Sequence, residues 1–139
     1  MIFASTRPTA SGVFTLLAGV SILTACGPSP SEFARTSSDA ASTLSAAAAT
    51  LRLEHEGRLT RGYAQASFLN YGDALEGLDA ELRSSQGAPG REAIEQLLAL
   101  YRIAQGVINE PCLDEGCDWR SQVEALERAK EAFQNAGEG

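Results

Sequence analysis

The three cysteines carry the most distinctive chemistry in this sequence. A cysteine thiolate can form a disulfide, bind a metal ion, accept a lipid or act as a nucleophile. Cys26 ends the stretch Leu23-Thr24-Ala25-Cys26, directly after an apolar run, whereas Cys112 and Cys117 lie five positions apart near the other end of the chain. The residues around each cysteine therefore decide which chemistry it is suited to.

The N-terminal segment has the parts of an export signal. Arg7 and the amino terminus supply a short positive region, and residues 13–23 form an apolar core that is too short to span a bilayer comfortably. With a leucine, two small residues and Cys26 at its end, the segment resembles the signal peptide of a bacterial lipoprotein, whose lipobox ends in the cysteine that receives lipid. The resemblance covers residues 1–26 and implies cleavage between Ala25 and Cys26, followed by membrane attachment through lipid on Cys26.

Two other interpretations of this segment are open. Ordinary signal cleavage after Ala25 would place Leu23 at position −3, where small residues are preferred. A retained transmembrane helix would need about twenty apolar residues, but Pro28 and Pro30 end the run just past Cys26. We therefore expect a cleaved signal peptide (1–25), a lipidated cysteine with a short tether (26–31) and a folded domain (32–139).

Lipidation would also account for the odd number of cysteines. If lipid consumes Cys26, Cys112 and Cys117 are left to pair with each other in an oxidising compartment. The surrounding stretch, residues 110–118, is rich in turn-forming residues, and closing so short a loop should stabilise the fold by about 2 kcal/mol. A redox-active pair, which favours Cys-x-x-Cys spacing, and free or mispaired thiols are the alternatives.

Length and charge exclude some classes of function. Without residues 1–25 the chain has 114 residues, enough for one domain with a substantial core. Since Arg7 leaves with the signal peptide, the mature chain carries 10 basic and 18 acidic side chains, a net charge of −8. Such an acidic surface repels phosphate backbones, so we expect no nucleic-acid partner.

Candidate ligands for a metal are few. His55 is the single histidine and has no histidine or cysteine at ligand spacing, so we expect it to be a structural residue at the edge of a helix rather than a metal ligand or a pH sensor. Glu54 and Glu56 flank it on different helical faces and do not form an acid–base pair. The carboxylates of the 110–118 loop could hold calcium, but the residue order of an EF-hand is absent.

Nothing in the sequence indicates catalysis. There is no Gly-x-Ser-x-Gly elbow, no Ser-x-x-Lys pair and no glycine loop that would hold a phosphate. We therefore expect neither an enzyme nor a bound cofactor. The aromatic residues of the helical segments suit a core, with a ligand cavity between helices as the alternative; they are Tyr63, Phe68, Tyr71, Tyr101 and Trp119.

Helix-forming residues dominate after Cys26, and apolar residues recur at helical spacing with no sustained alternation typical of strands. Ser29-Pro30-Ser31-Glu32 predicts the start of a first helix, with Ser29 as its N-cap, and Gly57 its end. A weaker alternative keeps residues 27–38 as a flexible tether and makes Asp39 the cap. Small residues between 42 and 50 would allow another helix to approach closely.

Three further helices are predicted. They span about 60–84, where Gly72-Asp73 could interrupt the helix, then Arg91 to Ile108, and finally Asp118, as N-cap, to Gly137. The helix from Arg91 to Ile108, the third of the four, has the widest apolar arc because Leu100 and Ile103 extend it, and it should be the most buried. Four amphipathic helices joined mostly by short turns predict an all-α, antiparallel, up-down-up-down bundle.

These patterns predict a non-catalytic interaction or structural module, anchored by lipid on the extracytoplasmic face of a bacterial membrane, with an envelope protein as its partner. In a Gram-negative cell the outer membrane is expected, because Gly27 replaces the aspartate that retains lipoproteins in the inner membrane. The alternative is a lipoprotein that binds a small ligand or a metal through an interhelical pocket or the 110–118 loop. A pocket lined by tyrosines and convergent polar groups would favour a ligand, and an exposed apolar groove a protein partner.

Overall fold

The computed structural model describes residues 29–139, which form five helices and, within that range, no strand. The helices are α1 (Glu32–His55), α2 (Arg61–Ala74), α3 (Leu78–Ser84), α4 (Arg91–Asn109) and α5 (Trp119–Glu138). None of these five is both long and apolar enough to cross a membrane. The predicted signal peptide, its cleavage site and Cys26 lie outside the described residues.

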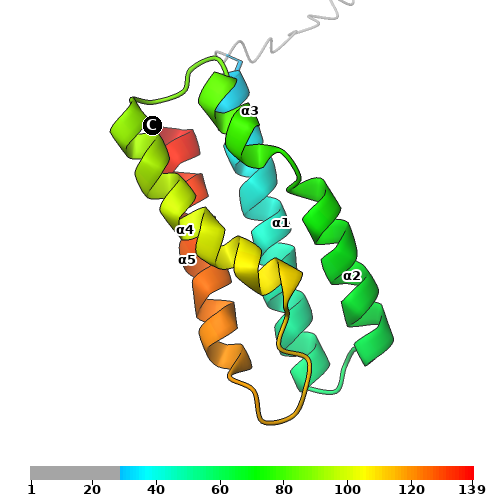
Figure 1. Ribbon diagram of the computed structural model, residues 1–139. Helices are drawn as coiled ribbons and strands as arrows, with labels where there is room; N and C mark the ends of the chain where they lie inside the picture. The colour runs from blue at the N-terminus through cyan, green and yellow to red at the C-terminus, as the bar shows by residue number, and fades with distance from the viewer. Residues whose placement is uncertain (1–28) are drawn as a thin grey trace, which may run out of the picture.

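The helices form an antiparallel bundle in which α2 and α3 together make one column (Figure 1). α1 and α4 run in one direction and the other two columns in the opposite direction. Both α1 and α4 pack against α5 and against the α2–α3 column, so α1 and α4 lie diagonally opposite each other. This arrangement confirms the predicted all-α bundle.

The two ends of the bundle differ in what they contain. The N-terminal end, as we call it, consists of residues 29–31, 85–90 and 137–139, where the Phe33 amide donates to the carbonyl of Gln86 at 3.0 Å. The loop end consists of residues 56–60 and 110–118, which join α1 to α2 and α4 to α5. The described chain therefore begins at the end opposite the cysteine loop.

The single helix predicted for residues 60–84 is wrong, because the chain breaks between α2 and α3. The break lies at Gly77, whose φ of +76° is in the left-handed region that glycine adopts without strain. Gly72, the glycine suspected of interrupting the helix, remains helical. At the break, the carbonyl of Leu75 accepts a hydrogen bond from the Leu78 amide at 3.2 Å and another from the Tyr101 hydroxyl at 3.0 Å. The break thus ties α2 to α4.

The start of α1 also differs from its prediction. Ser31, and not the serine two positions earlier, is the N-cap, and its hydroxyl accepts a hydrogen bond from the Ala34 amide at 3.1 Å. Glu32 is therefore the first helical residue, and its carboxylate accepts from the backbone amide of Gln86 at 3.2 Å instead of closing a capping box. A flexible tether over residues 27–38 is wrong from residue 32 onward, because α1 is already helical there.

The caps predicted at the loop end are present. Gly57 follows α1 with a φ of +72°. Asp118 caps α5, accepting hydrogen bonds from the amide of Ser121 at 3.2 Å and from its hydroxyl at 2.6 Å. Both bonds lower the pKa of the Asp118 carboxyl from its ordinary value, and the bond from the Ser121 hydroxyl has the larger effect.

The core is built around the predicted helical stripes, and α1 and α5 form its most extensive contact. Small residues of both helices are buried in the core, consistent with the close approach of α1 and α5. Ala47 and Ala48 are fully buried, as is Ala129 on α5. Gly137 passes so close to α1 that a Cβ atom there would lie 3.4 Å from the Ala34 carbonyl oxygen.

The prediction that the third helix would be the most buried is wrong. The helix concerned, α4, contributes seven buried residues, whereas α1 contributes ten. Ile103, which widened the apolar arc of α4, is 60% exposed. The apolar arc of α4 is therefore wider than the face that the core covers, and Ile103 lies outside that face.

Candidate functional site at the loop end

Cys112 and Cys117 are joined by a disulfide, in agreement with the predicted pairing. Their Cα atoms are 5.9 Å apart, within the usual range for such a bond. The disulfide closes the turn between α4 and α5. Residues 114–117 inside it are exposed, whereas Leu113 is buried.

Side chains from two helices hold the backbone of Cys112. Its amide donates to Gln122 Oε1 at 2.6 Å, and the amide nitrogen of the same glutamine donates to the carbonyl of Glu110 at 3.1 Å. The Cys112 carbonyl accepts a hydrogen bond from His55 Nε2 at 2.6 Å. The first half of the loop is therefore tied to both α1 and α5 independently of the disulfide.

His55 is a structural residue at this end of the molecule. Because a carbonyl oxygen only accepts, the bond to Cys112 requires the proton to be on Nε2. The ring stacks on Trp119, with centroids 4.8 Å apart and planes at 9°, and the Arg120 guanidinium lies 4.6 Å from the centre of the Trp119 ring. The histidine thus packs the last turn of α1 against the first turn of α5.

Glu54 and Arg61 form a charged pair beside this stack, and neither was singled out in the sequence as the centre of a site. The Glu54 side chain is 10% exposed; its Oε2 atom lies 3.4 Å from His55 Nε2 but forms no hydrogen bond within residues 29–139. Arg61 lies 4.0 Å from the other carboxylate oxygen, donates to the Leu113 carbonyl at 2.8 Å and pairs with Asp114 at 3.0 Å. Arg61 therefore fixes the cysteine loop to α2.

A groove of about 440 Å³ runs between α2, the end of α4 and the cysteine loop; we call it the α2–α4 groove. Phe68, Ile108 and Leu113, all buried, lie beneath it. Leu69, on its wall, is 73% exposed, more than any other large apolar side chain of the described residues. The full lining is Arg61, Gln65, Phe68, Leu69, Ile108, Asn109, Pro111, Leu113 and Asp114.

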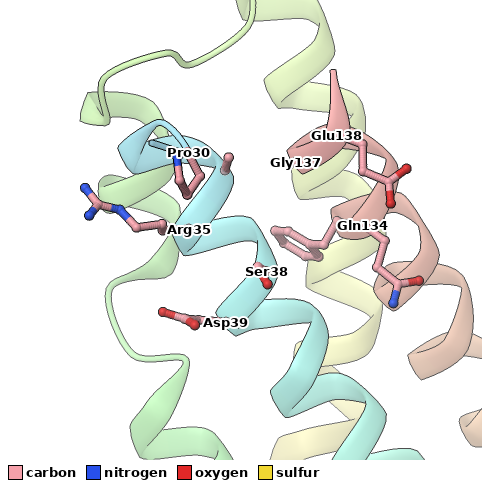
Figure 2. A pocket seen from close by; sticks show the side chains of 9 residues that line it. Pro30, Arg35, Ser38, Asp39, Gln134, Gly137 and Glu138 are labelled. Atoms are coloured by element: carbon pink, nitrogen blue, oxygen red, sulfur yellow. The ribbon is translucent and has the colours of Figure 1, made fainter. Parts of the chain in front are cut away.

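A second hollow, of about 500 Å³, lies at the N-terminal end between α1 and α5 (Figure 2). Phe133 forms part of its wall. Figure 2 shows Arg35 and Asp39 projecting from α1 on the side away from α5, while Gln134 and Glu138 project from α5. These polar groups do not converge on one point, as they do in sites that orient a small molecule.

The tyrosines do not line either hollow. Tyr101 is buried and donates to the carbonyl of Leu75, the residue that follows α2, and the Tyr71 hydroxyl lies 2.8 Å from Thr50 Oγ1 on α1. Tyr63 is 61% exposed on the first turn of α2. Two of the three tyrosines thus join helices, and the exposed apolar feature is the α2–α4 groove.

Among residues 29–139, no group of three or more His, Cys, Asp or Glu side chains is placed to hold a metal ion. Comparisons of the chain with protein-family models, with curated proteins and with solved structures give no match. The chemistry of the loop end is therefore interpreted from its own residues.

Proposed function

We propose that this protein is a lipid-anchored bacterial envelope lipoprotein whose helical bundle binds a protein partner and does not catalyse a reaction. The observation that carries the proposal is the lipobox-like sequence ending at Cys26. The start of α1 at Glu32, six residues later, is consistent with a short tether. The Cys112–Cys117 disulfide suits an oxidising compartment outside the cytoplasm.

The anchor would orient the bundle. Lipid on Cys26 holds the N-terminal end near the membrane, because only a few residues separate Cys26 from Ser31. The 24 residues of α1 span roughly 36 Å along the helix axis. The loop end, with the α2–α4 groove, then lies away from the bilayer, where another envelope protein can reach it.

Replacing the predicted lipidated cysteine tests the proposal. The full-length gene is expressed in a bacterial host with a labelled palmitate precursor, and the membrane and soluble fractions are compared. Cys26→Ser should lose the label and either leave the membrane pellet or accumulate as an uncleaved precursor. The matched control replaces Cys112 and Cys117 with serine, which removes the other thiols and should leave both label and membrane attachment intact. Label that persists in Cys26→Ser would refute the lipid anchor.

A further inference from the structure

We infer that the α2–α4 groove is a docking site for a segment of another protein that combines an apolar side chain with lysine or arginine. The inference rests on the proposed function only for the direction in which the groove faces relative to the membrane. The groove itself, its apolar lining and the charges around it belong to the folded domain and do not depend on lipidation.

The apolar part of the groove is continuous with the core. Phe68, Ile108 and Leu113 are less than 8% exposed and form its base, while Leu69 stands beside them with 73% of its surface exposed. An apolar side chain entering here would contact Leu69 and cover it. The volume of about 440 Å³ is ample for one large side chain and its neighbours.

The rim supplies groups that bind a peptide backbone. Gln65 on α2 and Asn109 on α4 are exposed on opposite sides of the groove. Each amide side chain can both donate and accept hydrogen bonds, which matches the alternating N–H and C=O groups of a peptide. A lipid tail has no such groups, so this rim favours a protein segment.

The charge around the groove favours a basic partner. The loop beside it carries the exposed carboxylates of Glu110, Asp114 and Glu115. Arg61 neutralises Asp114 at 3.0 Å, but Glu110 and Glu115 form no ion pair with any of residues 29–139. Glu110 and Glu115 do not line the groove, but each adjoins lining residues in the chain. Because opposite potentials attract across an interface, a lysine or arginine next to the apolar residue would be attracted to this acidic loop.

The same charge argues against two other occupants. Anionic headgroups are repelled by the acidic loop, and the proposed anchor places the bilayer at the other end of the bundle. In a symmetric dimer of this chain the same patch meets itself. Two copies of the loop would then bring Glu110 and Glu115 of each chain close to those of the other, with like charges opposed.

The test uses the full mature protein, purified from whichever of the membrane and soluble fractions contains it, with the same mild detergent present in every assay, and two peptide libraries. One library contains Leu, Phe, Lys and Arg flanked by Gly and Ser, and the other has Glu and Asp in place of Lys and Arg. We expect saturable binding of the basic library and little binding of the acidic one. Leu69→Ser should weaken binding about tenfold, the effect of losing one buried contact at the centre of an interface. The matched control is Ile103→Ser, which changes another exposed apolar residue (60% exposed) on α4 outside the groove, and this variant should bind normally.

Charge variants separate the two parts of the inference. Glu110→Gln combined with Glu115→Gln should weaken binding and reduce its dependence on salt, while Glu131→Gln on α5 should do neither. Amide shifts in NMR spectra should map to groove residues. Equal binding of both libraries, equal loss in Leu69→Ser and Ile103→Ser, or self-association that Leu69→Ser abolishes would each overturn the inference. Because the peptides bind the folded domain, this result is independent of whether Cys26 carries lipid, so either proposal can fail alone.

Discussion

Truncating a fully buried side chain of α4 tests the bundle directly. Leu98 has none of its surface exposed, and it lies in the helix that contacts α5 and the α2–α3 column. Leu98→Ala removes buried methyl groups and leaves a cavity that neighbouring residues fill only in part. Changes of this kind lower the free energy of unfolding by about 2–5 kcal/mol.

The matched control lies five positions further along the same helix. Ile103 is also a large aliphatic residue, but it is 60% exposed, so Ile103→Ala should change the free energy of unfolding by less than about 0.5 kcal/mol. Leu98→Ala and Ile103→Ala change residues of the same helix, with side chains of similar size, to the same residue. The two positions differ mainly in how deeply the side chain is buried. The comparison therefore measures the position of the core and not the helix propensity of alanine.

Both variants can be measured in a soluble form comprising residues 29–139, by urea unfolding followed by circular dichroism in the far ultraviolet. With a urea dependence of about 1–3 kcal/mol per molar, a loss of about 2–5 kcal/mol should lower the midpoint of Leu98→Ala by roughly 1–5 M. The midpoint of Ile103→Ala should stay close to that of the parent protein. Equal and small shifts for the two variants would show that this face of α4 is not buried, and the arrangement of the bundle would be wrong.

Two further predictions concern the disulfide and an ion pair. Replacing Cys112 and Cys117 with serine should lower the free energy of unfolding by about 2 kcal/mol while helicity is retained; peptide mass mapping of non-reduced protein should show one linked fragment, and two alkylatable thiols would contradict the pairing. The hydrogen bond from Lys130 lowers the pKa of Glu127 from its ordinary 4.5, so its stabilising contribution is present above that pH and is lost as the pH falls through the lowered value. Glu127→Gln should therefore reduce the urea midpoint at pH 7 but not at pH 2, and the exposed Glu131→Gln should have little effect at either pH.

The helices could be predicted because their signal is local. Each stripe of apolar residues at three- and four-residue spacing lies on one face of its helix. Burial of that face sets how the helix is rotated about its own axis relative to the core. The helix predicted last, which is α5, is a clear example. Asp118 caps it as predicted, and its Leu126 and Phe133 side chains are fully buried. Spacing and caps were sufficient for this helix because both act within a few residues.

The break between α2 and α3 was not predicted, and the one interruption considered, at Gly72-Asp73, is absent. Gly72 remains helical, and a Cβ atom there would make only an ordinary contact, 3.8 Å from Ile108 Cγ2 on α4. Gly77 instead adopts a positive φ, and the Leu75 carbonyl in that turn accepts from both the Leu78 amide and the Tyr101 hydroxyl. The choice between the glycines depends on contacts with α4, which a pattern confined to residues 60–84 does not contain.

The contacts of the loop end follow from tertiary structure in the same way. His55 was expected to be structural, but its bond to Cys112 joins residues 57 positions apart, and its stack on Trp119 joins α1 to α5. Arg61 gave no signal in the sequence beyond its place near the start of α2. The groove exists because the disulfide loop, held by these residues, lies across the ends of α2 and α4.

The disulfide and the hydrogen bonds therefore have separate roles at this end of the bundle. Cys112 is held by His55 and Gln122 whether or not it is bonded to Cys117. The buried Leu113 is held in turn by Arg61, so the base of the groove does not require the disulfide. In the folded protein the disulfide closes the exposed, acidic half of the loop. Its contribution to stability comes mainly from restricting the unfolded chain. If the groove binds a basic partner, the hydrogen-bonded half of the loop supplies apolar surface, and the half closed by the disulfide supplies the exposed carboxylate of Glu115.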